Sequence, residues 1–410
     1  MKKFLIISIV LLLISGSIFG YSLSQHPLTL SPSAETEESQ EKATEPAAPA
    51  STASPGDELN INPDSMNTGG IFSAYYEKAS NYVAGMSKEQ LVGQMIISVA
   101  DNTAEAATDV NRYYLGGVQF LNESFDYMSK DEVKNAVAAV RTAATTSPIL
   151  AVQEEGGRRN AVSSHAAFED VTFDSPRDTY DAGGIAAVER LEDTKTTFLK
   201  ELGFNLNLAP VLDLAKEYDQ IMYSRSLCGD AQITSTYAEY VAKFNQAKGV
   251  SVALKHFPGY GTINDTADLV VVDHRDAATI RSEDYLPFKA GAAAGAHFVM
   301  ISNVVVENID AAHTAALSPT LHRELRENIG FTGLIITDVL DAVDYSAYSD
   351  GRDVYVAAVL AGNDLILAEK CSDAYNAILS AVDSGTISET ILRQVCTRII
   401  AYKYAAGLMQ

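Results

Sequence analysis

The sequence predicts an α/β fold, a (β/α)8 TIM-like barrel in a single domain. Two observations support this prediction. Eight short apolar runs recur between Met95 and Ala368, mostly separated by segments long enough for a helix, and most of these runs end in polar or charged residues. Apolar strands that alternate with helices favour a parallel sheet covered on both faces. Eight such units in roughly 340 residues predict a closed barrel with its active site at the carboxyl ends of the strands.

The eight predicted strands follow one another at the spacing of strand-helix units. Helical periodicity fills the gaps, most clearly over Asp131–Thr142 and Thr234–Ala247. The apolar runs cover residues 95–99, 116–121, 149–152, 206–212, 250–254, 298–301, 334–337 and 364–368.

The fifth run has the most informative end. It leads into Lys255 and His256, which are followed by a turn at Pro258-Gly259. A buried strand that ends in charge at a glycine-containing loop is typical of a substrate site in a barrel enzyme. The alternative is an ordinary solvated strand end.

The N-terminal part of the chain predicts export rather than folded structure. Residues 1–25 read as a signal peptide or N-terminal membrane anchor, because Lys2 and Lys3 precede the apolar run Phe4–Ile14. The run is short for a full membrane span, which favours a cleaved signal. Residues 26–68 are rich in Pro, Ser, Ala and Glu and predict a disordered linker, and residues 69–410 form the barrel domain. We therefore expect a secreted or cell-surface protein.

Charge and cysteine usage exclude several classes of function. The net charge of −23 argues against nucleic acid and against anionic membrane surfaces as partners. Cys228, Cys371 and Cys396 do not form a disulfide framework or a metal-binding spacing, so buried thiols or a single bridge remain possible. The chain has no tryptophan, so tyrosine or phenylalanine must supply any stacking against a sugar ring.

Several motifs follow one another in a recognisable order. They are Glu155-Gly156-Gly157-Arg158, Asn207–Asp213, Ser224–Leu227, Lys255–Gly259, Gly333–Asp338, Leu317–Pro319 and Ala361–Asp364. Together they resemble glycoside hydrolase family 3, in its single-domain β-N-acetylglucosaminidase (β-N-acetylhexosaminidase) branch, from about Met86 to the C-terminus. The resemblance implies a retaining reaction through a covalent intermediate, without a metal or an organic cofactor.

The same resemblance implies roles for individual residues. Asp338, which follows the seventh run, matches the nucleophile; the alternative is a helix N-cap. Arg225, Lys255 and His256 match residues that hold sugar hydroxyls. The alternatives are a salt bridge from Arg225 to Asp213 or Asp230, and a satisfied core histidine at His256.

The chain departs from the family pattern at the rim of the barrel. The position of the general acid/base histidine is Ala267, and Asp265 matches the aspartate that supports it. Asp265 or Asp268 is then the local candidate for the acid, and His274 and Tyr260 are weaker ones. Four further family residues are replaced. The family's aspartate is Gln153, its arginine is Ala161, its histidine is Asn303, and its second acid after the nucleophile is Val339. Gln153 and Asn303 remain predicted substrate contacts.

Three functional hypotheses follow, all with a carbohydrate as partner. The first is an exported β-N-acetylhexosaminidase-like hydrolase acting on terminal β-linked amino sugars of peptidoglycan or oligosaccharides, with Asp338 as nucleophile. The second is a catalytically impaired carbohydrate-binding or scaffold protein, suggested by Ala267. The third is an active enzyme with altered sugar specificity.

Overall fold

The computed structural model describes residues 69–218, 220, 222–261 and 270–410, and these residues form a barrel of parallel strands. Neighbouring strands pair in the order β11-β9-β7-β6-β3-β2-β1-β12, and a bridge from Ile336 to Leu365 joins the two ends of that order. The strands are β1 (Ile96–Ala100), β2 (Gly117–Phe120), β3 (Ile149–Val152), β6 (Leu206–Asn207), β7 (Ser251–Phe257), β9 (Phe298–Ile301), β11 (Leu334–Thr337) and β12 (Ile366–Ala368). All eight predicted strands, and the predicted fold class, are therefore confirmed.

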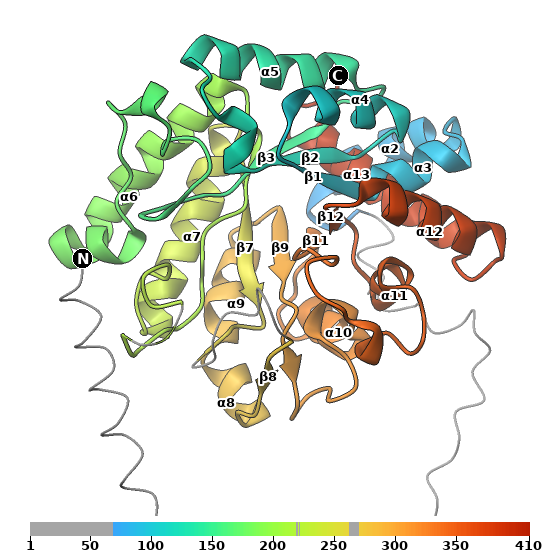
Figure 1. Ribbon diagram of the computed structural model, residues 1–410. Helices are drawn as coiled ribbons and strands as arrows, with labels where there is room; N and C mark the ends of the chain where they lie inside the picture. Colours follow the sequence, from blue (N-terminus) through green and yellow to red (C-terminus); the bar gives the residue numbers. More distant parts are fainter. Residues whose placement is uncertain (1–68, 219, 221, 262–269) are drawn as a thin grey trace, which may run out of the picture. The chain divides into compact units, whose positions relative to one another are not determined.

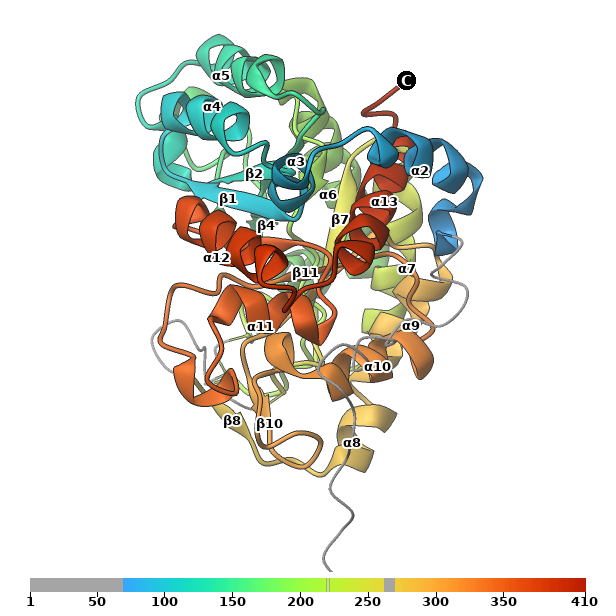
Figure 2. The ribbon, with the colours of Figure 1, turned by 90° about the vertical axis from the view of Figure 1, so that its right-hand side faces the viewer.

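Helices connect successive strands and surround the sheet (Figures 1 and 2). Polar residues fix several helix starts: in the capping box of α5, for example, Ser129 and Glu132 satisfy each other's backbone N–H groups. The connecting helices are α4 (Thr103–Arg112), α5 (Lys130–Ala143), α6 (Pro176–Leu202), α7 (Ala231–Ala247), α8 (Ala277–Ser282), α9 (Tyr285–Ala293), α10 (Pro319–Glu327) and α11 (Val354–Ala361). Both helices singled out by periodicity, α5 and α7, are present.

Further helices precede the first barrel strand or follow the last one. They are η2 (Gly70–Tyr75), α2 (Tyr76–Ala84) and α3 (Lys88–Gln94) before β1, and α12 (Cys371–Asp383) and α13 (Glu389–Ala405) after β12. The buried carboxylate of Asp364 ties this region to the barrel, because it accepts hydrogen bonds from Arg326 of α10 at 2.8 Å and from Arg398 of α13 at 2.6 Å. These contacts anchor the chain immediately before the closing strand β12.

Short strands and one-turn helices follow the carboxyl ends of the barrel strands. The hairpin β4 (Glu154–Gly156) and β5 (Arg159–Asn160) follows β3, and a separate parallel pair is formed by β8 (Val272–Asp273) and β10 (Val305–Val306). One-turn helices complete the rim segments: η3 (Asn122–Phe125), η4 (Ala166–Phe168), η5 (Ala315–Leu317) and η6 (Ser346–Tyr348). The eight apolar runs in the sequence predict only the barrel strands, and they do not distinguish these short elements from loops.

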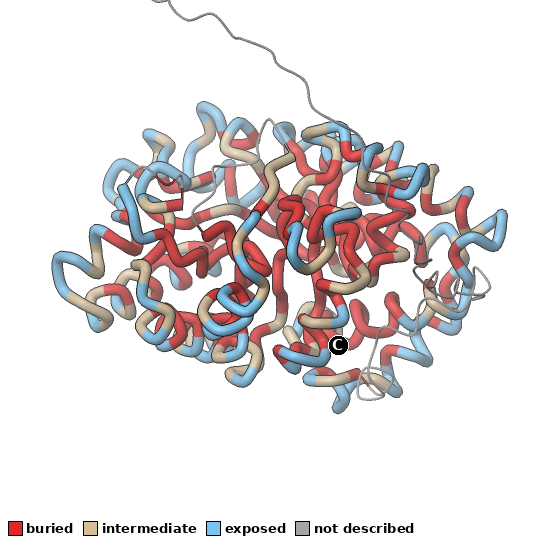
Figure 3. Tube along the Cα trace, turned by 90° about the horizontal axis from the view of Figure 1, so that it is seen from below, coloured by how far each residue is buried: buried red, intermediate tan, exposed pale blue. Residues whose placement is uncertain are grey.

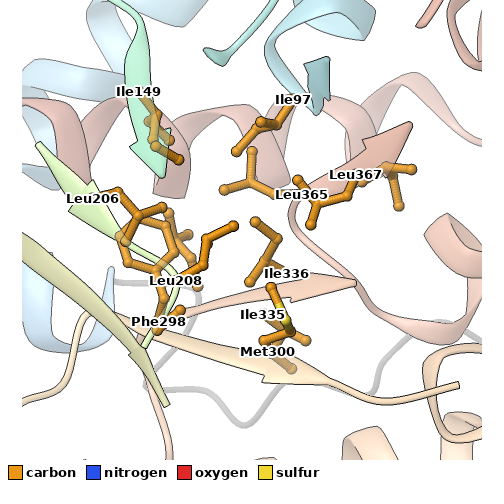
Figure 4. Close-up of a cluster of buried hydrophobic side chains, with 14 of the residues drawn as sticks. Ile97, Ile149, Leu206, Leu208, Phe298, Met300, Ile335, Ile336, Leu365 and Leu367 are labelled. Atoms are coloured by element: carbon orange, nitrogen blue, oxygen red, sulfur yellow. The ribbon is translucent and has the colours of Figure 1, made fainter. Parts of the chain in front are cut away.

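The barrel interior is apolar. Ile97, Ile149, Leu206 and Leu365 converge between the strands (Figure 4), and buried residues occupy the centre of the Cα trace while exposed ones lie outside (Figure 3). Strand register aligns Ile97, Gly117 and Ile149 across three neighbouring strands.

Every second side chain of a strand points to the same face, so residues two or four positions beyond an inward-facing residue also point inward. Gln119 lies two residues beyond Gly117 in β2, and Gln153 lies four beyond Ile149. Through the paired strands the same face includes Lys255 and Asp338. These four polar side chains, of Gln119, Gln153, Lys255 and Asp338, therefore lie at one mouth of the barrel.

Two further expectations concern cysteines and the membrane. All three cysteines are free thiols, with Cys371 and Cys396 buried, so a bridge does not form between them. Within residues 69–410, apart from the gaps named above, no helix is both long enough and apolar enough to span a membrane. The predicted signal or anchor and the predicted linker lie outside the described residues and stay predictions.

Candidate active site

The centre of the candidate site is the carboxylate of Glu155, on β4 just beyond the end of β3. Its Oε1 accepts from Lys255 Nζ at 2.6 Å, from Arg225 Nη2 at 2.8 Å and from Gln153 Nε2 at 2.9 Å. Its Oε2 accepts from Arg225 Nε at 2.9 Å. The Glu155 side chain is only 2% exposed. One buried carboxylate thus contacts three predicted sugar-binding residues: Gln153 after β3, Arg225 in the segment before α7 and Lys255 on β7.

Burial and charge oppose each other at this cluster. Burial alone would raise the pKa of Glu155, but the charges and hydrogen bonds of Lys255 and Arg225 outweigh it and hold that pKa far below its usual range. Burial lowers the pKa of Lys255, and the nearby charge of Arg225 acts in the same direction. The charges of Glu155 and Asp338 and the hydrogen bond to Glu155 only partly offset these effects. The cluster is an ionised carboxylate between two cations.

His256 belongs to a second, adjoining pair. Its Nδ1 lies 2.7 Å from Oδ2 of the fully buried Asp213, whose Oδ1 accepts from the backbone N–H of Tyr260 at 2.8 Å. Its Nε2 lies 3.4 Å from Nη2 of Arg225. A guanidinium can only donate, so Nε2 accepts and Nδ1 carries the proton that it donates to Asp213. His256 is therefore held in one tautomer, with Nε2 facing the Glu155 cluster.

These contacts correct the alternatives that the sequence left open for Arg225. Among the described residues its carboxylate partner is Glu155, and neither Asp213 nor Asp230 takes that place. Asp213 is engaged by His256, and Asp230 caps the N-terminus of α7 by accepting from Ile233 N at 2.8 Å. Glu155 lies within the motif Glu155-Gly156-Gly157-Arg158, but the sequence did not predict a role in the site for it. The signal was present, because a glutamate directly after a buried strand needs a cationic partner.

Asp338 follows β11 at the same end of the barrel. Its backbone N–H donates to Ile301 O at 3.0 Å, and its Oδ1 accepts from the N–H of Val339 at 2.8 Å. No helix begins here, since the next ones are η6 and, with Asp353 as its cap, α11. The helix N-cap alternative for Asp338 is therefore wrong. Its side chain is partly exposed and available to a ligand.

The segment after Asp338 is held by two residues. Asn303, which follows β9, donates from Nδ2 to Val339 O at 3.0 Å. Tyr345 is 3% exposed, and burial together with the charge of Asp338 raises the pKa of its phenol, an effect that the side chain of Asn303 opposes. Asn303 therefore contacts the backbone beside the candidate nucleophile, and Tyr345 is a neighbour of Asp338 that no motif in the sequence indicated.

Of the candidates for the proton donor, His274 and Tyr260 lie within the described residues. Asp265, Ala267 and Asp268 lie outside the described residues, so their assignment stays a prediction. His274 has a side chain that is 71% exposed and lies 2.6 Å from Glu307 Oε2, at the end of β8. Tyr260 is buried, with its ring edge-on to His256 at 5.1 Å.

A supporting ion-pair network lies behind Tyr260. Arg275 Nη1 contacts Oδ2 of the buried Asp284 at 2.9 Å and Arg275 Nη2 contacts Asp273 Oδ2 at 2.8 Å. Burial raises the pKa of Asp284 to about 6, although Arg275 opposes the shift. A side chain at Gly259 would collide with Asp284, so glycine is required where this network meets the turn after β7. Within the described residues, no three His, Cys, Asp or Glu side chains are grouped so that they could hold a metal ion.

Comparison with protein families identifies this arrangement. Residues 87–402 match the model of the glycosyl hydrolase family 3 N-terminal domain. A beta-hexosaminidase of Stenotrophomonas maltophilia (strain K279a) is 30% identical over 282 residues, which are 67% of this chain and 82% of the relative. A beta-hexosaminidase of Xylella fastidiosa (strain M12) is 30% identical over 295 residues, or 69% of this chain and 86% of the relative.

Solved structures agree with this result. A β-N-acetylhexosaminidase from Beutenbergia cavernae is 26% identical with a TM-score of 0.65, and the match covers 78% of this chain and 99% of the other. A family 3 β-N-acetylglucosaminidase from Paenibacillus shares the fold with a TM-score of 0.72 at 24% identity, over 79% of this chain and 63% of the other.

Proposed function

The chain belongs to glycosyl hydrolase family 3 and is a glycoside hydrolase, and from that premise we propose that it hydrolyses β-linked N-acetylglucosaminides with retention of configuration. The relatives named above are beta-hexosaminidases and β-N-acetylglucosaminidases, which supports this substrate class. The observation that carries the proposal is the buried cluster of Glu155, Lys255 and Arg225 at the same mouth of the barrel as Asp338. Buried charged donors are suited to binding sugar hydroxyls.

The proposed reaction has two steps on Asp338. The carboxylate oxygen that does not accept from Val339 N–H attacks the anomeric carbon, while the bond to the leaving oxygen breaks and that oxygen takes a proton. Water then attacks the anomeric carbon and gives a proton to the group that protonated the leaving oxygen, while the ester bond to Asp338 breaks and the sugar and the free carboxylate are released. Asn303 holds Val339 O and so steadies the backbone next to the nucleophile.

We assign the proton to Asp265 because the position of the family histidine is Ala267. The two candidates within the described residues are poorly suited to this role, since the His274 side chain is exposed beside Glu307 and Tyr260 is buried. A carboxyl group acts as an acid near neutral pH when its surroundings raise its pKa.

The test is hydrolysis of aryl β-N-acetylglucosaminides by the full-length chain and by Asp338→Asn and Asp265→Asn. We expect Asp338→Asn to abolish turnover of every aryl substrate. We expect Asp265→Asn to slow poor leaving groups far more than activated ones, because an activated aryl oxide needs little proton transfer. Unchanged turnover in Asp338→Asn would overturn the assignment of the nucleophile.

A second candidate function is supported by Ala267. A family member without the usual acid/base histidine could bind carbohydrate in the barrel mouth without turning it over. Under that alternative the folded wild-type chain binds N-acetylglucosamine but hydrolyses none of the aryl substrates, activated ones included. Multiple turnovers on a natural glycan exclude it.

The location of the protein is also part of the proposal. The basic start and the apolar run Phe4–Ile14 support export, and peptidoglycan is then the nearest polymer that contains β-linked N-acetylglucosamine. Fractionation of cells that express the full-length chain tests this idea. Recovery only in the cytoplasmic fraction would contradict it.

A further inference from the structure

Glu155 lies at an irregularity of the hairpin that follows β3. Glu154 of β4 pairs with Asn160 of β5. Gly156 pairs with Arg159, the residue next to Asn160, so three residues of β4 face two of β5. A bulge of this kind re-aims a side chain and leaves the extra residue without a partner in the ladder. The backbone of Glu155 therefore depends on groups outside β5 to hold it.

Lys195 of α6 supplies such a group from the layer of helices around the barrel. Its Nζ donates to the backbone O of Glu155 at 3.0 Å, and to Oε1 of Glu192, one turn earlier on the same helix, at 2.7 Å. The side chains of Lys195 and Glu192 are 1% and 2% exposed. A buried ammonium is costly unless it is paired, and the carboxylate of Glu192 pairs it here. One donor of this paired cation is thus directed at the carbonyl of Glu155.

Glu192 is in turn fixed by α7, which packs against α6 (Figure 1). Its Oε1 also accepts from Tyr237 OH at 2.8 Å, and its Oε2 accepts from Asn245 Nδ2 at 3.3 Å. Both of these partners are buried. Packing and hydrogen bonds of this kind lock the rotamers of the groups behind a site. Glu192 therefore fixes the position of Lys195 Nζ, and with it the contact to Glu155.

The neighbouring residue of β4 is held separately. Asn207 of β6 accepts from Glu154 N with its Oδ1 at 3.0 Å and donates to Glu154 O with its Nδ2 at 2.9 Å. The backbone of Glu154 therefore keeps both of these bonds when Lys195 is replaced. The contact from Lys195 acts on Glu155, the residue that carries the carboxylate of the cluster.

We propose that Lys195 is a positioning residue for the proposed reaction, which acts through Glu155. By holding the carbonyl of Glu155 it keeps the carboxylate in place, and this carboxylate orients the sugar-binding cations Lys255 and Arg225. This inference rests on the proposed function, in which those two cations bind the sugar. Substrate-binding groups must keep their positions to about 0.5 Å, so loss of the contact should weaken sugar binding and turnover.

The test compares Lys195→Met with Lys195→Met/Glu192→Gln in the full-length chain. Lys195→Met leaves the buried carboxylate of Glu192 without its cation and should lower the melting temperature, whereas the double change removes that charge and should recover most of the loss. Neither variant has the contact to Glu155 O. We therefore expect both to lose about tenfold in kcat/KM for an aryl β-N-acetylglucosaminide and in calorimetric affinity for N-acetylglucosamine, the effect of one lost hydrogen bond from a charged group.

A coupling measurement separates positioning from a general loosening of the protein. Lys195→Met added to Glu155→Gln should lower kcat/KM no further than Glu155→Gln alone, because Lys195 acts through Glu155, whereas independent effects would multiply. The control is Tyr237→Phe, which removes a different bond to Glu192 Oε1 and leaves the bond from Lys195 to Glu155 in place. It should keep the wild-type kcat/KM.

The outcomes distinguish this inference from the proposed function. Wild-type kcat/KM and affinity in Lys195→Met/Glu192→Gln would overturn the role of Lys195 and leave the proposed function standing, and so would multiplied losses in the combination with Glu155→Gln or an equal loss in Tyr237→Phe. Binding of N-acetylglucosamine without turnover rejects the hydrolase function, and a tenfold loss of that affinity in the double variant still supports Lys195. A wild-type chain that neither binds nor hydrolyses rejects both.

Discussion

Replacing Glu155 with glutamine should damage both stability and activity, because it removes the negative charge that Lys255 and Arg225 share. The two contacts from Lys255 Nζ and Arg225 Nη2 measure 2.6 and 2.8 Å, and the Lys255 and Glu155 side chains are 1% and 2% exposed. Removing one member of a buried ion pair costs about 3–5 kcal/mol, because the remaining charge stays buried without compensation.

The expected change in melting temperature follows from the size of the domain. With an unfolding entropy of about 2.1 cal/mol/K per residue, a domain of roughly 340 residues loses about 1.4 °C per kcal/mol. We therefore expect Glu155→Gln to melt about 5 °C lower than the wild type. Displaced sugar contacts should also lower kcat/KM for an aryl N-acetylglucosaminide about 100-fold, the scale of a misplacement near 1 Å.

The pH dependence of this effect has a definite sign. Because the pKa of Glu155 is lowered in the folded protein, its contribution to stability is present above the ordinary glutamate pKa of about 4.3 and is lost as the pH falls below it. The difference in melting temperature between the wild type and Glu155→Gln should therefore be largest near neutral pH and shrink in acid.

The neighbouring Glu154 provides a matched control. It is as deeply buried, but its partners are neutral: Val162 N–H at 2.9 Å and the N–H and hydroxyl of Ser163. Burial raises the pKa of Glu154, with these hydrogen bonds acting against the shift. Glu154→Gln should cost only about 1 kcal/mol. If both variants melt alike, or Glu155→Gln retains wild-type kcat/KM, the charge cluster does not have the role given to it here.

Two further predictions concern groups outside the Glu155 cluster. Asp364→Asn should destabilise the protein by about 3–5 kcal/mol in denaturant titrations, because it leaves two buried arginines without their carboxylate; an unchanged midpoint would contradict this. Burial alone would lower the pKa of His313, but hydrogen bonds to Asp350 and Asp310 outweigh burial and raise that pKa. The stabilisation that protonated His313 gives the folded protein is therefore complete below the ordinary histidine pKa of about 6.5, and it is lost as the pH rises through the raised value. Melting temperatures of His313→Gln and wild type should consequently differ at pH 5 and converge in alkali, and a constant difference would argue against the ion pair.

The strands were predictable because each one is a continuous apolar run, as expected for a parallel sheet buried on both faces. The kink of α6 at Gly184, where φ is 65°, and the hairpin after β3 were not predictable from such runs. Their conformations depend on turn geometry and on tertiary contacts.

The site was predictable only in part. Lys255 and Asp338 stand out as charges at strand ends, so sequence position alone singles them out. The role of Glu155 depends on which side chains the barrel brings opposite it, and its partners Lys255 and Arg225 lie on distant segments of the chain. Tyr345 was not predicted because it lies near Asp338 on a segment that contains no predicted strand and no motif.

The pairing of β1 with β12 has a consequence for the synthesis of the protein. Ile96 pairs with Ile366, so β1 meets its last neighbour only after about 270 further residues have been made. At roughly 5–20 residues per second, a ribosome needs about 14–54 s for that stretch. During this interval one edge of β1 has unsatisfied backbone groups, and such an edge is a template for pairing with other chains. The nascent polypeptide is therefore exposed to aggregation through this edge during the whole interval, until β12 has been made and can pair with β1.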